Sequence, residues 1–557
     1  MSRFKWNIYP QLTEDQLKWA GKIPHVVAQI LYNRGVTDLS SCDQFLKIDE
    51  HLAGDPFLLP DMEKAVIRIF QALLSGETIV VYGDYDCDGI TSTAILVRGL
   101  SALGGKVRPY IPHRLLEGYG LKSEALEKLK KEGTGLIITC DCGITALSEV
   151  KRAHRLGLDI IITDHHMPLE ELPRAVASIN PHRLDSKYPF SHLSGAGVAY
   201  KLLQALYTSL ARIMETDNLL DLVALGTVAD MVPLVGENRL FVKQGIELIN
   251  SIPRTGIREL LLQARVSGEI DAGRISWILA PRLNTPGRLE HAMASFKLLM
   301  TDSAEEAREI SVWLEQKNSE RQKLTADAFN KAKEKVREEG LAPVIFVADD
   351  DFPVGVAGLV ANRLADEFYR PVFVIHTGEV WSTGSARSIP EFNIINALQK
   401  CRNLLVHFGG HARAAGFTIS TAKLLHLKKA LIDQAEVELA GVDLRPHLDI
   451  DTVTSLTSLG TGSVFQYIQQ LEPFGEGNPE PVFLSKGVTV VDCRTMGPNG
   501  EHLRLKVKQN DSVWDAVGFG LGEYINQINT PLDIVYNLEL DKWNGREALR
   551  LNILDLS

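Results

Sequence analysis

The chain has 557 residues, of which 45% are hydrophobic and 23% charged, as in a globular protein of about three or four domains. No apolar run is long enough to span a membrane, and the six scattered cysteines do not form a disulfide framework, so we expect a cytoplasmic protein. The net charge of −11 argues against broad binding of duplex nucleic acid but is compatible with a narrow basic groove.

Residues 1–60 contain short helical stretches without recognisable chemistry, and we expect them to form a helical cap on the first domain. The first domain, residues 61–300, opens with an apolar strand-like run that ends in three carboxylates at alternate positions, Asp84, Asp86 and Asp88. Carboxylates this close repel one another unless they are solvated or share a cation, and hard oxygen ligands suit Mg²⁺ or Mn²⁺. By itself, the pattern is equally compatible with an acidic surface turn.

Two further strand-like runs and one helix-like run also end in polar groups, which are Asp141, Asp164, His165, His166 and Asp230. Strand and helix alternate through this region, which predicts a parallel α/β sheet. Ligands of such sheets bind beyond the carboxyl ends of the strands, so we expect these groups to converge on one crevice. Aspartates together with histidine fit a two-metal phosphoesterase centre.

Six ordered motifs carry a family resemblance. Four of them resemble the motifs of the DHH phosphoesterases: Gly83–Gly89, Asp141–Gly143, Asp164–His166 and Gly226–Asp230. Two downstream motifs, Gly384–Ser388 and Gly409–Gly416, resemble those of the DHHA1 domain. In combination, order and length, they resemble the RecJ family of exonucleases specific for single-stranded DNA. The resemblance covers nearly the whole chain.

This resemblance implies an α/β fold with a parallel-sheet DHH domain (61–300) and a smaller α/β DHHA1 domain (343–442), joined by a long helix within residues 301–342. The helix is also expected from the sequence, since Ser303–Gly340 is rich in Glu, Lys and Ala and has opposite charges three to four residues apart. In residues 443–557, short strands with turn signals follow a turn-rich stretch. They predict a small β-barrel, for which the resemblance implies an OB-like nucleic-acid-binding domain.

The resemblance also assigns roles in the site. The implied ligands of two Mn²⁺ or Mg²⁺ ions are Asp84, Asp86, Asp88, Asp141, His165 and Asp230. Asp141 or Asp88 is expected to bridge the two ions. We expect Asp164 to orient His165 through its second ring nitrogen, and His166 to contact the scissile phosphate or the leaving oxygen, so Asp164 and His166 are the catalytic candidates.

Two groups of residues are candidates for binding substrate. Before the long helix lie Arg282, Asn284 and Arg288, whose arginine forks suit phosphate. As an isolated cluster it would more readily form a structural turn paired with local carboxylates, but it matches the Arg-x-Asn-x-x-Gly-Arg motif of the RecJ family. The DHHA1-like motifs supply the second group, which is Ser385, Arg387, Gly409, Gly410 and His411.

At two positions the chain departs from the family pattern. Phe352-Pro353 stands where RecJ enzymes usually carry Trp-His, which removes one expected substrate contact. Tyr82 stands where many DHH proteins place a metal-binding histidine, so Asp84 is expected to complete that ligand set.

The implied function is metal-dependent hydrolysis of single-stranded DNA from its 5′ end, in DNA repair and recombination. A single-strand-binding protein and a helicase are the implied partners, and no membrane is involved. One alternative is a DHH phosphodiesterase for short oligonucleotides or cyclic dinucleotides, which would need neither the long helix nor the barrel. Another is a non-catalytic replisome scaffold, which should have lost metal ligands, whereas every acidic motif is intact here.

Overall fold

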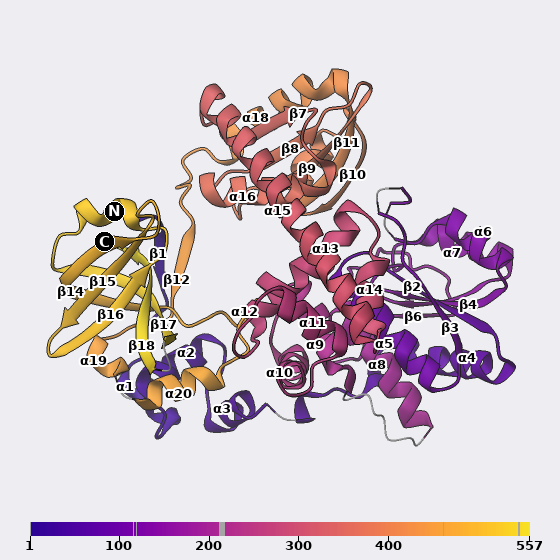
Figure 1. Cartoon of the computed structure of the whole chain (residues 1–557), viewed down its shortest axis with the longest axis horizontal. Coiled ribbons are helices and arrows are strands. Elements are labelled where there is room, and N and C mark those ends of the chain that lie inside the picture. The colour runs from indigo at the N-terminus through magenta and orange to yellow at the C-terminus, as the bar shows by residue number, and fades with distance from the viewer. Residues whose placement is uncertain are drawn as a thin grey trace.

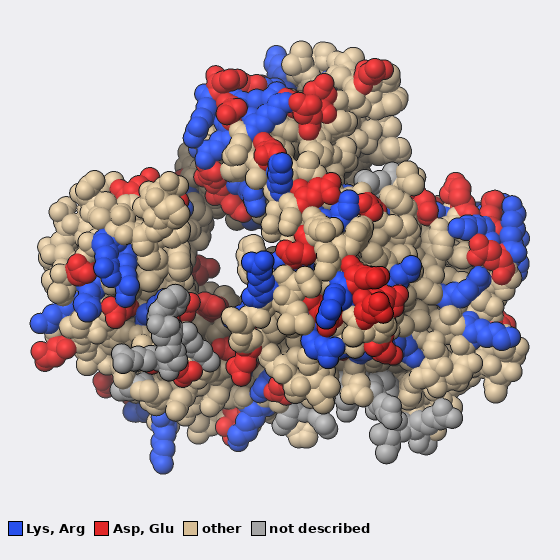
Figure 2. Space-filling model, viewed as in Figure 1, with Lys and Arg blue, Asp and Glu red and all other residues tan. Residues whose placement is uncertain are grey.

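The structure is a computed structural model that describes residues 2–48, 50–114, 116–118, 120–210, 218–460, 462–543 and 546–557. The chain is arranged in three lobes, with a long helix rising from the first to the second and an extended segment leading to the third (Figure 1). Figure 2 shows an opening between the lobes, with basic and acidic side chains on its rim. Among the described residues, no helix is long and apolar enough to cross a membrane.

A five-stranded parallel sheet with the order β3-β2-β4-β5-β6 forms the centre of the first lobe, which confirms the parallel α/β prediction. Its strands are β2 (Thr78–Gly83), β3 (Lys106–Tyr110), β4 (Thr134–Cys140), β5 (Asp159–Thr163) and β6 (Ala177–Ile179). Alternate residues of β2, β4 and β5 enter two different cores, because the sheet is covered on both faces. Three helices pack on one face, namely α4 (Met62–Ser75), α5 (Cys87–Ala102) and α8 (Gly195–Ser209). The other face carries α6 (Ser123–Lys131) and α7 (Leu147–Leu156).

The rest of the first lobe is helical. Its elements are α9 (Leu220–Ala229), α10 (Gly236–Ser251), α11 (Thr255–Gln263), α12 (Ala272–Arg274), the π-helical turn η5 (Ile275–Leu279), α13 (Ala280–Leu289) and α14 (Met293–Met300).

The long helix, α15, spans Ala304–Glu339, as the sequence predicts. The side chain of Ser303 caps it by accepting the Glu306 N–H, and Gly340 ends it with a positive φ of 83°. Its first half buries Leu314 in the core of the first lobe, and its second half buries Ala332 in that of the second lobe. The helix therefore ties two separately packed domains together.

The second lobe is built on a mixed sheet with the order β10-β11-β9-β8-β7. Its strands are β7 (Ile345–Asp349), β8 (Val372–His376), β9 (Trp381–Arg387), β10 (Leu405–His411) and β11 (Ala414–Ser420). Its helices are α16 (Val354–Phe368), α17 (Ile394–Lys400), η6 (Thr421–Lys423) and α18 (Leu424–Glu438).

The third lobe is a five-stranded barrel, closed by pairing between β14 and β17. Its strands are β14 (Phe483–Met496), β15 (His502–Gln509), β16 (Ser512–Gly518), β17 (Leu532–Trp543) and β18 (Arg546–Leu556). Around it lie β12 (His447–Ile450), β13 (Thr452–Val453), α19 (Leu456–Leu459), α20 (Gly462–Gln470) and η7 (Gly522–Gln527).

Most of the N-terminal segment packs on this barrel. Its elements are β1 (Lys5–Ile8), α1 (Glu14–Leu17), η1 (Lys18–Ala20), α2 (His25–Asn33), α3 (Leu39–Leu46), η2 (Glu50–Leu52) and η3 (Pro56–Leu58). β1 pairs with β12, and the buried carboxylate of Asp555 accepts the Trp6 indole N–H at 2.7 Å. Leu31 of α2 lies in the barrel core, whereas Leu59 lies in that of the first lobe. The cap that the sequence predicts on the first domain is thus formed only by the end of this segment.

Candidate metal centre

The first acidic motif turns tightly from β2 into α5. Asp86 is the N-cap of α5 and accepts the Gly89 N–H at 3.1 Å, so its carboxylate points back over the strand end. A Cβ at position 89 would lie 2.7 Å from backbone atoms of Asp84, a distance that only glycine allows. The motif therefore gathers Asp84, Asp86 and Asp88 at the carboxyl end of β2.

Asp141 occupies the centre of the site. It follows β4, is 3% exposed and has a φ of 58°, a left-handed conformation that costs a non-glycine residue about 1 kcal/mol or more. Its Oδ1 atom lies 3.0 Å from Nε2 of His165, and the same Nε2 lies 3.4 Å from Oδ2 of Asp230 and 3.9 Å from Oδ2 of Asp88.

The ligand atoms of these residues form three overlapping sets, within each of which all atoms lie within 4.8 Å of one another. The sets are Asp84–Asp86–Asp141, Asp141–His165–His166 and Asp88–His165–Asp230. The structure thus brings together all six predicted metal ligands, from the ends of three strands and one helix. Asp141 is the carboxylate common to two sets, which is the position a bridging ligand requires.

Two atoms at the centre lack the partners that buried polar atoms normally have. Oδ1 of Asp141 and Nε2 of His165 are both buried, and within the described part of the chain neither makes a hydrogen bond, although the two atoms lie 3.0 Å apart. Unpartnered buried polar atoms are costly unless something else satisfies them. A carboxylate oxygen and an imidazole nitrogen converging on one point suit a divalent cation such as Mn²⁺, so the donor set fits a metal centre.

Burial and mutual repulsion shift the protonation of this cluster. Burial first, and the charge of Asp86 second, raise the pKa of both Asp84 and Asp88 to about 7. Burial and the neighbouring aspartates raise the pKa of Asp230 to about 9 and that of Asp141 well above the usual range. Burial and repulsion therefore favour the protonated forms of these carboxyls when no cation is bound, and a cation that binds here competes with protons.

Asp164 orients His166 rather than His165, contrary to our expectation. Its Oδ1 atom accepts the N–H groups of His165 and His166 and lies 2.8 Å from Nδ1 of His166, while Oδ2 accepts the Ile144 N–H. Burial opposes the charge of Asp164, but these hydrogen bonds hold its pKa below the usual range. The hydrogen bond from His166 to Asp164 raises the pKa of His166 to about 9, so this imidazole is protonated at neutral pH.

The N-terminus of α8 binds Asp88. Backbone N–H groups of Gly195 and Ala196 donate to its two carboxylate oxygens at 2.6 and 2.9 Å. A Cβ at position 195 would lie 2.7 Å from Cβ of Asp141, so this glycine is needed for close packing on the site.

Next to the metal loop lies a cluster of cations. The guanidinium of Arg114 lies 4.5 Å from the ring centre of Tyr85, and Arg288 and Arg387 are close enough for the three charges to affect one another. Burial first, and neighbouring arginines second, lower the pKa of Arg288 to about 10. Within the described part of the chain, none of the three arginines forms a salt bridge, so the cluster is suited to an anion such as phosphate.

The other predicted residues of this first group have structural partners. Arg282 forms a salt bridge with Glu315 of α15 at 2.6 Å, which is the local pairing we considered for an isolated turn. The side-chain oxygen of Asn284 accepts the Cys87 N–H at 2.7 Å and so supports the start of α5. Of the three predicted residues, only Arg288 lies in the unpaired cluster.

In the second lobe, the predicted residues form a compact group on neighbouring strands. Arg387 of β9 and His411 of β10 both pair with Ala414 of the intervening strand, and Ser385 and Gly409 both pair with Gly416. Gly410, with a φ of 142°, lies between the two β10 positions. Burial, together with the charges of Arg387 and Arg413, lowers the pKa of His411.

At the two departures from the family pattern, Phe352 and Tyr82 are buried in hydrophobic cores, whereas Pro353 is half-buried and is the N-cap of α16. Phe352 is 1% exposed and packs beneath α16, so its side chain does not face the gap between the lobes. Tyr82 is fully buried on the sheet face opposite α5, where its hydroxyl donates to the Gly120 carbonyl at 3.1 Å. Asp84, in contrast, reaches Asp86 and Asp141.

Sequence reasoning missed two residues near the site. Arg114 follows the carboxyl end of β3 and could have been found by extending the strand-end rule to that strand. Asn180 follows β6 and is fully buried; its amide donates to the His166 carbonyl at 2.9 Å, and its oxygen accepts the His182 N–H. No motif identifies it in the sequence.

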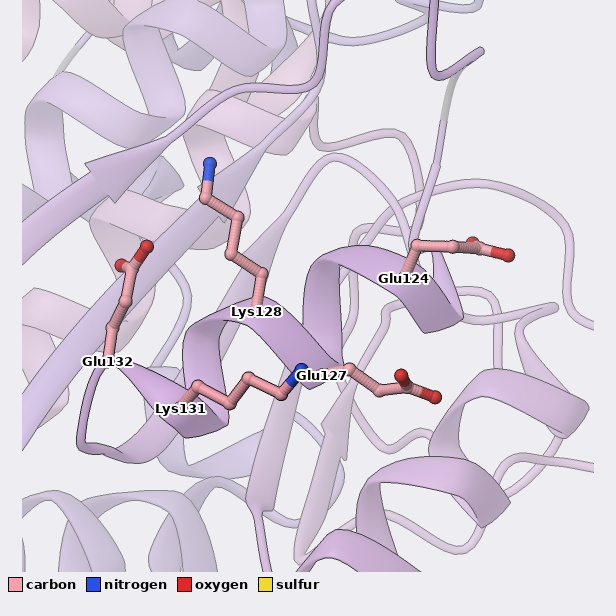
Figure 3. A pocket seen from close by; sticks show the side chains of 5 residues that line it. All are labelled: Glu124, Glu127, Lys128, Lys131 and Glu132. Carbon is pink, nitrogen blue, oxygen red and sulfur yellow. The ribbon is translucent and has the colours of Figure 1, made fainter.

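A shallow hollow beside α6 holds none of these residues (Figure 3). It is lined by Glu124, Glu127, Lys128, Lys131 and Glu132. Two of its carboxylates pair with arginines, Glu127 with Arg152 and Glu132 with Arg108. With its mixed and partly compensated charge, it has no feature of a catalytic site.

Three family models match the chain. They are the N-terminal domain of the DHH family at residues 78–227, the DHHA1 domain at 341–437 and the RecJ OB domain at 450–555. The single-stranded-DNA-specific exonuclease RecJ of Bacillus subtilis is 38% identical over 563 residues, covering 100% of this chain and 71% of that protein.

Two crystal structures of RecJ from Thermus thermophilus resemble the whole chain. The Mn²⁺ complex has a TM-score of 0.86 and 31% sequence identity, covering 100% of this chain and 80% of that one. The Mg²⁺ complex has a TM-score of 0.77 and 28% identity, covering 100% and 78%.

Proposed function

Since the chain belongs to the RecJ family of single-stranded-DNA-specific exonucleases, we propose that it hydrolyses single-stranded DNA from the 5′ end in a metal-dependent reaction. The observation that carries this proposal is the convergence of six candidate metal ligands, Asp141 among them, next to an unpaired cluster of arginines. The first feature supplies the chemistry, and the second supplies a place for a terminal phosphate.

In the proposed mechanism, Asp84, Asp86 and Asp141 would hold one cation, and Asp88, His165 and Asp230 would hold the other. Asp141 would be the shared ligand. Mn²⁺ or Mg²⁺, when bound, supplies an activated water and offsets the charge that develops on the phosphoryl oxygens. Asp164 keeps His166 protonated and fixes its ring. The other ring nitrogen of His166 can then donate a proton to the leaving oxygen or bind the scissile phosphate.

The proposed 5′ polarity comes from the resemblance to the RecJ family, and the cationic cluster supplies a place for the terminal phosphate. Arg114 and Arg288 come from the first lobe and Arg387 from the second, so a terminal phosphate held among them would lie where the two lobes meet. The single strand would then leave toward the barrel, an OB-type module that binds single strands in other proteins. A path between two domains tied by α15 accepts one strand more readily than a duplex.

Removing the metal tests the proposed activity. We expect chelator-treated protein to leave a labelled single strand intact and to regain hydrolysis when Mn²⁺ or Mg²⁺ is added, with a blunt duplex and a cyclic dinucleotide as control substrates. Hydrolysis without a divalent cation would contradict the metal mechanism. Cleavage of the dinucleotide alone would favour the small-substrate alternative.

The metal-dependent stability should vary with pH. Burial raises the pKa of Asp84 and Asp88 to about 7 and that of Asp230 to about 9. In the metal-free protein, these carboxyls contribute their full stabilisation at a pH below the pKa of free carboxyl groups. This stabilisation is lost as the pH rises through the raised pKa values. Cation binding replaces those protons, so we expect Mn²⁺ to raise the Tm more at about pH 8.5 than at about pH 6. Thermal unfolding with and without Mn²⁺ measures this, and an increment that falls with pH would contradict it.

Partners and location follow from the same proposal. A helicase would generate the single strands that the site accepts, and a single-strand-binding protein would hold them, so we propose both as partners in DNA repair and recombination in the cytoplasm. The complete set of ligands argues against a non-catalytic scaffold.

A further inference from the structure

A turn from the third lobe lies against the segment that carries Asp230. The turn is Gly475–Asn478, in which the Gly475 N–H donates to the Asn478 carbonyl at 2.9 Å and the Asn478 N–H donates back at 3.1 Å. This turn belongs to the turn-rich stretch that precedes the barrel strands. The proposed mechanism assigns no role to that stretch.

A backbone hydrogen bond joins the two segments, and little space is left between them. Asp230 ends α9, and four residues later the Leu234 N–H donates to the Glu476 carbonyl at 2.7 Å. A Cβ on Gly477 would lie 3.0 Å from Cβ of Pro233, and one on Gly475 would lie 2.7 Å from Cδ1 of Leu234. A side chain at Gly477 would therefore press on the Pro233 ring and backbone, whereas one at Gly475 would displace the side chain of Leu234.

Both sides of the contact are held rigidly. The fully buried amide of Asn478 donates to the carbonyls of Leu471 and Pro473 at 2.9 and 2.8 Å. Arg239 of α10 is 2% exposed and donates to the carbonyls of Gln470 and Glu472 at 2.9 and 3.0 Å. Because the buried guanidinium of Arg239 bonds to these carbonyls and to no carboxylate among the described residues, its hydrogen bonds favour one geometry of this loop.

We propose that the Gly475–Asn478 turn positions Asp230 as a metal ligand, so that the third lobe acts on the metal centre as well as on the DNA. The segment from Asp230 to Leu234 includes Met231, which has a φ of 58°, and its far end is fixed by the Glu476 carbonyl. Glu476, Gly477 and Asn478 are positioning residues that act through Asp230. This inference rests on the proposed role of Asp230 as a ligand.

The test compares two glycines that have similar backbones but different surroundings. Gly477 has a φ of 70° and faces Pro233, whereas Gly487, in the same domain, has a φ of 64° and nothing within 4 Å of its Cβ position. We expect Gly477→Ala to weaken Mn²⁺ binding by about 10- to 100-fold, the range typical for the partners of metal ligands. We expect Gly487→Ala to bind Mn²⁺ as the wild type does.

Two further readouts separate positioning from general damage. In metal-free Gly477→Ala, hydrogen exchange of the Leu234 amide should be faster, while affinity for a labelled single strand should be unchanged. Higher Mn²⁺ concentrations should restore kcat. If Gly477→Ala does not fold, Gly475→Ala replaces it, because its new methyl group meets only the movable side chain of Leu234.

Equal Mn²⁺ affinity of the Gly477→Ala and Gly487→Ala proteins would overturn the inference, as would a loss confined to single-strand affinity. If the proposed function is wrong and Asp230 is not a metal ligand, Asp230→Ala would leave Mn²⁺ binding intact. This result distinguishes failure of the proposed function from failure of the positioning role.

Discussion

Asp141→Ala is expected to reduce hydrolysis of single-stranded DNA to less than about one tenth of the wild-type rate, a loss of more than about 1.4 kcal/mol of transition-state stabilisation. Asp141 belongs to two of the three ligand sets, and its Oδ1 atom lies 3.0 Å from Nε2 of His165. Removing it disturbs both proposed cation positions at once. Initial rates on a labelled single strand, at saturating Mn²⁺, measure the effect.

The fold should survive this change. Burial and neighbouring aspartates raise the pKa of Asp141, so the charged form is unfavourable in the metal-free protein, and a neutral side chain at this position avoids that cost. Asp141→Asn keeps the shape and tolerates the left-handed backbone better than alanine, and it should equal or exceed the wild-type Tm without metal while gaining less from Mn²⁺.

The matched control is Asp159→Asn. Asp159 begins β5, at the other end of the same sheet, and pairs with Arg68 at 2.7 Å. Its replacement should leave the rate nearly unchanged. An Asp141→Ala protein that keeps more than about a tenth of the wild-type rate would contradict the assignment of Asp141 as the shared ligand.

Arg387→Ala is expected to lower kcat/KM by about 10- to 100-fold on 5′-phosphorylated strands and much less on 5′-hydroxyl strands. Hydrogen bonds to charged groups contribute about 1.5–3 kcal/mol, and Arg387 has no salt-bridge partner among the described residues. Its guanidinium would therefore be available to a terminal phosphate. Paired kinetics on the two kinds of strand measure the difference.

Arg402→Ala provides the control for a loss of positive charge, because Arg402 is an exposed arginine of the same lobe. It should affect both kinds of strand equally and only slightly. Equal losses on both kinds of strand in Arg387→Ala would show that Arg387 binds the strand elsewhere than at its end.

Local patterns predicted the features that depend on local physics. Apolar runs ending in polar residues located the strands of the first lobe, and the strand-end rule placed Asp141 and His165 in one crevice. The unbroken polar pattern from Ser303 to Gly340 predicted both ends of α15 to within one residue. β17 has no clear strand signal, because polar residues such as Asn537 and Glu539 interrupt its apolar pattern.

Long-range contacts were not predictable in this way. Nothing in the sequence of α2 shows that Leu31 enters a barrel core formed more than four hundred residues later. Likewise, that Asp164 binds His166 and not His165 follows from the course of the backbone beyond β5. Arg114 lies outside every motif; the strand-end rule applied to β3 would bring it to the crevice, but its proximity to Arg288 and Arg387 depends on the fold.

We expect this protein to degrade single strands from the 5′ end at a metal centre built on Asp141. A time course with Mn²⁺, on single strands labelled at either the 5′ or the 3′ end and on a blunt duplex, tests it most directly. We predict that the 5′ label is released first as a mononucleotide, that the 3′ label stays on progressively shorter strands, and that the duplex is spared. Earlier release of the 3′ label, or comparable digestion of the duplex, would contradict the account.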